Sequence, residues 1–143
     1  MSNSIAIILE NEYFKLYTNN NNIHIDSQPT EIQEKYESND VLSYEEKIKR
    51  LDQLLEYFYN LWKVIECKNE DITYTAHFNV HKIMFHVPVE SYIKIKNVLE
   101  SLNVIFKKYL KETYVKVEND LMKHFFDLIL TFYKPIKPIH IIK

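Results

Sequence analysis

The chain contains no glycine in 143 residues. Glycine adopts a positive φ without steric cost, and it lets the backbone approach a phosphate closely. The Walker A loop, the GxGxxG dinucleotide turn, the GxSxG nucleophile elbow and the EF-hand loop all require it. The sequence therefore excludes these designs. It also predicts that asparagine or aspartate takes the positions that need a positive φ.

Length and composition favour one domain that covers residues 1–143. The chain is 46% apolar, which is enough for a substantial core. The net charge is −2 and Arg50 is the only arginine, so the basic face of a nucleic-acid-binding protein is missing. Cys67 is the only cysteine, which excludes an internal disulfide. No signal peptide and no run of about 20 apolar residues is evident, so we expect a cytoplasmic protein without membrane contact.

Short runs of β-forming residues predict strands. Ile5–Leu9 and Tyr13–Tyr17 are extended segments, and the asparagine run 19–22 turns the chain into Ile23–Asp26. These segments predict an N-terminal hairpin or meander. Apolar and polar residues alternate over Asp71–Val80, which is typical of a further strand. Two shorter strands are expected over residues 114–117 and 139–142.

Three segments show the period of an amphipathic helix. Ser43 and Glu46 have capping-box spacing, and apolar residues follow at steps of three and four as far as Ile65. A second helix is expected over Tyr92–Tyr109, after Pro88. The third is expected over residues 121–132, with Asn119 or Asp120 as its cap.

The order of these elements predicts the fold class. From Asp71 onward strands and helices alternate, which implies parallel pairing through right-handed crossovers. We predict an α/β (α+β) fold with a mixed sheet of four or five strands that begins with an antiparallel hairpin. Three main helices pack mainly on one face, and the N-terminal and C-terminal strands lie at the edges.

The arrangement of strands and helices from Asp71 to Ile142 resembles the STAS, or anti-sigma-factor-antagonist-like, domain. The likeness covers most of the chain at the level of topology. The Asp-Ser-Ser-Gly turn of that family is absent, and Pro88-Val89-Glu90-Ser91 stands near the corresponding place. The resemblance implies a regulatory, non-enzymatic module that acts through protein contacts, with Ser91 in the place of the phosphoacceptor.

Residues after the parallel strands form a candidate ligand-binding edge. Ligands of open α/β sheets bind beyond the carboxyl ends of strands. Asn79 and His81 follow one strand, and Glu118 and Asn119 follow the next. His81 and Glu118 would suit acid–base chemistry. The favoured interpretation is that residues 118–120 cap the third helix and complement its dipole, so we assign no catalytic residue.

His77, His81 and His86 are the densest group of histidines. On a helix, His77 and His81 would share a face as zinc ligands can. The segment around His77 has the pattern of a strand, however, where residues four apart are about 13 Å apart. We therefore expect solvent-facing histidines, no metal site and no cofactor.

Three functions are compatible with this sequence. The favoured one is a non-enzymatic protein-interaction module with a protein partner or a homodimer, because apolar residues occupy second helix faces: Leu54, Ile93, Val98 and Ile105. The alternative is a small-molecule or lipid-binding module with a cavity between the sheet and the long helices. A further alternative is a hydrolase or transferase that uses His81 and Glu118.

Overall fold

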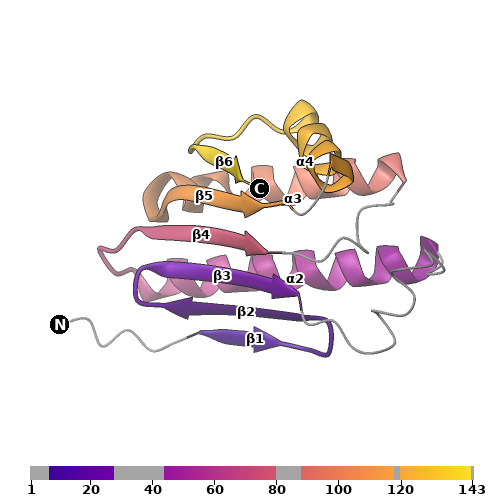
Figure 1. Cartoon of the computed structure of the whole chain (residues 1–143). Coiled ribbons are helices and arrows are strands. Elements are labelled where there is room, and N and C mark those ends of the chain that lie inside the picture. The colour runs from indigo at the N-terminus through magenta and orange to yellow at the C-terminus, as the bar shows by residue number, and fades with distance from the viewer. Residues whose placement is uncertain (1–6, 28–43, 80–87, 118–119, 143) are drawn as a thin grey trace.

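A computed structural model describes residues 7–27, 44–79, 88–117 and 120–142 (Figure 1). Several residues named above lie outside these ranges: Ser43, His81, His86, Glu118 and Asn119. The helix cap assigned to Ser43, the ligand-binding edge and the acid–base pair therefore remain predictions.

The described strands form one mixed sheet in chain order. They are β1 (Ile8–Glu10), β2 (Phe14–Asn19), β3 (Asn22–Ser27), β4 (Tyr74–Asn79), β5 (Leu110–Lys116) and β6 (Ile139–Ile142). The pairs β1–β2 and β2–β3 are antiparallel, whereas β3–β4, β4–β5 and β5–β6 are parallel. The mixed sheet and its antiparallel beginning were predicted, but the strand number is six rather than four or five.

A turn at Asn11 separates β1 from β2 and so accounts for the additional strand at the N-terminus. The side-chain Oδ1 of Asn11 accepts the backbone N–H groups of Tyr13 and Phe14, at 2.8 and 2.9 Å. This local bonding reverses the chain between β1 and β2, so the first strands form a three-stranded meander. The next turn, between β2 and β3, contains Asn20 with φ 56°. The prediction that asparagine replaces glycine at positive φ is confirmed there.

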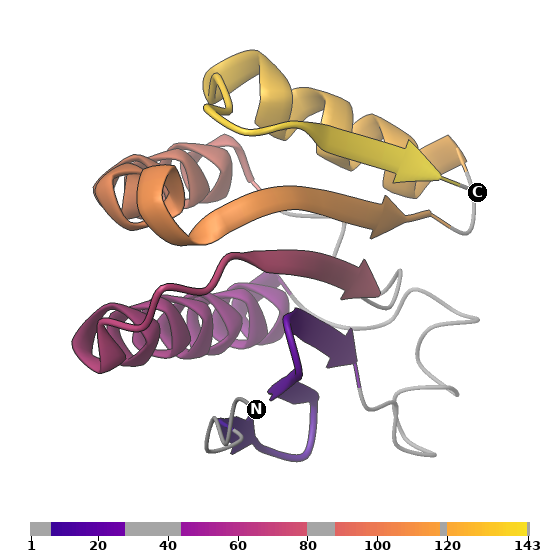
Figure 2. The same ribbon diagram turned by 90° about the vertical axis from the view of Figure 1, so that its left-hand side faces the viewer.

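Among the described residues, three helices connect the parallel strands: α2 (Tyr44–Lys68), α3 (Val89–Tyr109) and α4 (Asp120–Phe132). All three lie on one side of the sheet, as predicted (Figures 1 and 2). Helix α3 leads directly into β5, so this strand begins at Leu110 and not at Tyr114. The opposite face of the sheet is left without a helix among the described residues.

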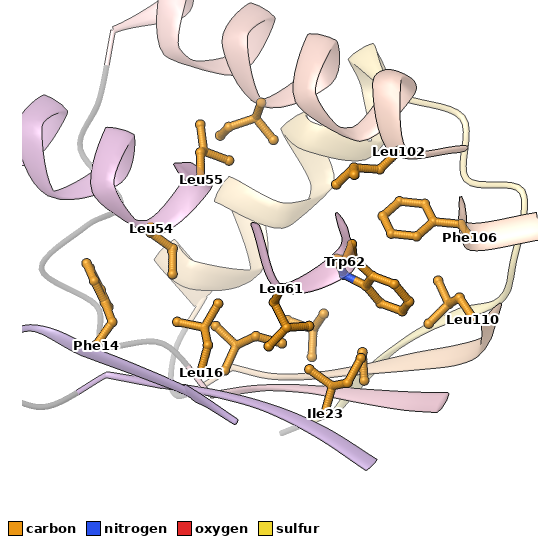
Figure 3. Close-up of a cluster of buried hydrophobic side chains, with 14 of the residues drawn as sticks. Phe14, Leu16, Ile23, Leu54, Leu55, Leu61, Trp62, Leu102, Phe106 and Leu110 are labelled. Carbon is orange, nitrogen blue, oxygen red and sulfur yellow. The ribbon is translucent and has the colours of Figure 1, made fainter. Parts of the chain in front are cut away.

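The core lies between the helices and the inward-facing side chains of the sheet (Figure 3). Trp62 of α2 is fully buried, and its ring meets that of Phe106 from α3 edge to face, with centroids 5.1 Å apart. Leu54 and Ile105 also belong to this core. These two positions therefore do not contribute to the exposed second helix faces that the sequence suggested.

Candidate functional site

An apolar cavity of about 130 Å³ lies between the sheet and the helices. All three helices and the strands β4, β5 and β6 contribute to its wall. Because α3 stands between α2 and α4 in the fold, the space runs beneath α3. Its lining includes these apolar side chains: Leu55, Phe58, Phe78, Leu99, Phe106 and Ile129.

Several side chains of the sheet that face the helices are only partly buried, and they line the apolar cavity described above. Phe78, Thr113, Ile139 and Ile141 all belong to the lining. They point toward the helices, because they alternate with residues of the uncovered face, yet they are half-buried. Leu99, above them on α3, is also half-buried. The helices thus leave unfilled volume over the C-terminal half of the sheet.

The wall offers few polar groups. Burial, together with the nearby Glu100 carboxylate, raises the pKa of Tyr133 to about 12, and its hydroxyl donates to Asn103 Oδ1 at 2.6 Å. The indole Nε1 of Trp62 is buried and has no hydrogen-bond partner within the described part of the chain. Thr113 and Lys137 are the remaining polar residues of the lining. The cavity is therefore suited to an apolar molecule.

A row of stacked rings crosses the uncovered face of the sheet. It consists of Tyr17, His24, His77, Tyr114 and His140, which lie opposite one another in register on β2 to β6. Successive ring centroids are 4.9, 5.0, 5.8 and 4.8 Å apart, and the planes are nearly parallel. We call this set the ring row. Since each inner ring has a neighbour on both sides, the rings present mainly their edges to solvent.

Polar side chains hold the ring row in place. Nε2 of His77 lies 2.9 Å from Asn22 Oδ1, so this nitrogen carries the proton and donates. At the other end, His140 Nε2 lies 3.0 Å from Glu112 Oε1. Asn22 is two residues from His24 on β3, and Glu112 is two residues from Tyr114 on β5. Each partner therefore lies on a strand next to that of the histidine it contacts. These bonds fix the orientation of the imidazole rings.

The central imidazole of the ring row is more weakly basic than a free histidine. Burial lowers the pKa of His77, and the adjacent His24 ring lowers it further, while the Asp26 carboxylate opposes the change. His77 faces away from the core, in agreement with the prediction of a sheet histidine. No three histidine, cysteine or carboxylate side chains of the described residues are close enough together to hold a metal ion.

Of the other predicted site residues, the structure describes Asn79 and Ser91. Asn79 is exposed at the end of β4, where it lies opposite Asp26. Ser91 is buried in the first turn of α3, with only 6% of its surface exposed. Phosphorylation of Ser91 would therefore require that turn to open. The general place of the cavity was predicted as an alternative, but the half-buried residues that surround it were not identified.

No protein-family model, no curated protein sequence and no solved structure matches this chain. Among the described residues, none of the helices combines the length and the apolar character needed to cross a membrane.

Proposed function

We propose that this chain binds a small apolar molecule in the cavity beneath α3. The observation that carries the proposal is a partly open space of about 130 Å³ with an almost entirely apolar wall. An engineered protein cavity of about 150 Å³ with a comparable wall stays dry and binds benzene or xenon. A space of this size therefore accommodates roughly six carbon atoms.

Packing energetics support occupation of the cavity. The half-buried side chains Phe78, Leu99 and Ile129 lack partner atoms on the side that faces the space. A ligand would restore these dispersion contacts and remove its own apolar surface from water, at about 0.8 kcal/mol for each buried methylene. No acidic side chain stands in the lining, so the proposal is of a binding module without catalysis.

Titration with 1-octanol tests the proposal. Trp62 is the only tryptophan of the chain and lines the cavity, so its fluorescence reports occupation. We expect a saturable change in the wild-type protein. Leu99→Phe places extra carbon atoms at the cavity and should weaken binding by about tenfold. Ile93→Phe, on the exposed side of the same helix, is the matched control and should leave the affinity unchanged. The proposal is wrong if 1-octanol shows no saturable binding.

A protein partner is the second candidate function. On α3, Val89, Ile93 and Val104 are 61%, 45% and 77% exposed, and they lie along one outer side of the helix. Exposed apolar surface of this kind is typical of interaction sites. Sedimentation equilibrium tests the homodimer: we expect self-association that Val104→Lys weakens. A monomer at all concentrations would refute it.

Membership of the STAS-like family stays a prediction from the element order.

A further inference from the structure

The cavity has one cationic residue in its wall, Lys137, in the segment between α4 and β6. This side chain is partly exposed, and it takes part in none of the ion pairs found among the described residues. An unpaired ammonium is not buried in apolar surroundings, because desolvation is too costly. The stem of Lys137 therefore lies along the cavity wall while its ammonium meets water. This residue marks the mouth of the cavity.

Thr113 stands at the same end of the cavity. Its backbone N–H donates to the carbonyl oxygen of Pro138 at 3.0 Å, which places β5 against the segment that carries Lys137. The Thr113 side chain belongs to the lining. The Thr113 hydroxyl and the Lys137 ammonium are thus gathered at one end. The other polar groups of the wall are the Tyr133 hydroxyl, which is bonded to Asn103, and the buried indole N–H of Trp62.

From this separation we infer that the ligand is an unbranched, medium-chain carboxylate. Its alkyl chain lies beneath α3, and its carboxylate meets Lys137 and Thr113 at the mouth. The inference rests on the proposed function, and it adds the charge and the direction of the ligand. A carboxylate accepts hydrogen bonds from both an ammonium and a hydroxyl. An alkylammonium ion would be repelled by the Lys137 ammonium, and an alcohol would lack the negative charge that pairs with it.

Three ligands of equal chain length test the inference: octanoate, 1-octanol and octylammonium. We expect octanoate to bind the wild-type protein about tenfold more tightly than 1-octanol, as one partly solvated charged contact allows. Octylammonium should bind most weakly. Trp62 fluorescence reads all three titrations on the full chain.

Two lysine variants give the matched comparison. Lys137→Met keeps a long apolar stem and removes the charge, so octanoate should bind it no better than 1-octanol does. Lys134→Met removes a charge three residues away that is exposed and absent from the lining, and it should not change either affinity. An unchanged 1-octanol affinity in Lys137→Met shows that the cavity of this variant is intact.

The two proposals fail in different ways. If 1-octanol binds saturably but octanoate binds no more tightly, or if Lys137→Met leaves the preference for octanoate in place, the carboxylate inference is wrong and the cavity proposal stands. If 1-octanol does not bind saturably, the cavity proposal is wrong, and the carboxylate inference, which rests on it, is wrong as well. Chain length gives a further criterion: affinity should rise about fourfold per methylene from butanoate onward until the cavity is filled.

Discussion

At the scale of single residues, asparagine occupies turn positions that glycine often takes in other proteins. Asn20 and Asn69 have φ values of 56° and 51°, and Asn11 uses its side-chain oxygen to hold a turn. Asn69 also accepts hydrogen bonds from Lys108 Nζ and the Tyr109 hydroxyl, both at 3.2 Å. Asparagine tolerates the left-handed region because its short polar side chain bonds locally. The absence of glycine therefore constrains the turns without preventing the fold.

Asn20→Ala tests the role of asparagine in the turn between β2 and β3. Alanine in the left-handed region is strained, so we expect the free energy of unfolding to fall by about 1 kcal/mol. Asn20→Gly should be at least as stable as the wild type. Asn21→Ala is the control, because Asn21 does not have a positive φ. Urea denaturation measures all three; equal effects of alanine at both positions would contradict the assignment.

The lowered pKa of His77 predicts a loss of stability in mild acid. A histidine of the unfolded chain titrates near pH 6.5, roughly its ordinary value. Because the folded state holds the pKa of His77 below that value, the unfolded chain binds more protons as the pH falls. The free energy of unfolding should therefore decrease from about pH 6.5 downward, through the folded pKa.

His77→Tyr separates this effect from other titrations. The variant keeps an aromatic ring in the ring row and removes the titrating group. We expect the difference in urea stability between pH 7.5 and pH 5 to be smaller in His77→Tyr than in the wild type. An identical difference in both proteins would show that His77 does not cause the acid sensitivity.

At the scale of elements, periodicity predicted much of what is observed. The three helices and the strand β4 were identified mainly from the spacing of apolar residues, and the final strand from its β-forming residues after Pro138. The parallel order of β4 to β6 was predicted from the alternation of strands and helices. Boundaries were less accurate. Strand β5 begins at Leu110 because α3 passes into it without a loop, and no local signal separates the two. The prediction left a hairpin or a meander open at the N-terminus, because the turn at Asn11 depends on a side-chain hydrogen bond that a sequence pattern does not show.

Two leucines of α3 distinguish the packed part of this helix from the part above the cavity. Leu102 is fully buried, and we expect Leu102→Ala to destabilise the protein by roughly 3 kcal/mol. Leu99 is half-buried at the cavity and already lacks neighbours on one side, so Leu99→Ala should cost only about 1 kcal/mol. Urea denaturation measures both changes. Equal losses would indicate that Leu99 is packed as tightly as Leu102.

At the scale of the whole molecule, the three described helices lie on one face of the sheet, and the two faces therefore differ. The other face carries the ring row, which joins residues from five strands and exists only when their register is correct. The covered face contains the cavity, whose size depends on how far α3 stands from the sheet. Sequence patterns assign residues to faces, but they do not fix register between distant strands or the volume between layers. Neither site could therefore be described residue by residue beforehand.

The central claim is that the space beneath α3 is an apolar binding cavity. A crystal structure determined under xenon pressure tests it most directly, because xenon enters apolar cavities of this size and is located by its electron density. We predict xenon density within contact distance of Phe78, Leu99 and Ile129. The claim is contradicted if side chains fill this region and no xenon is found beneath α3.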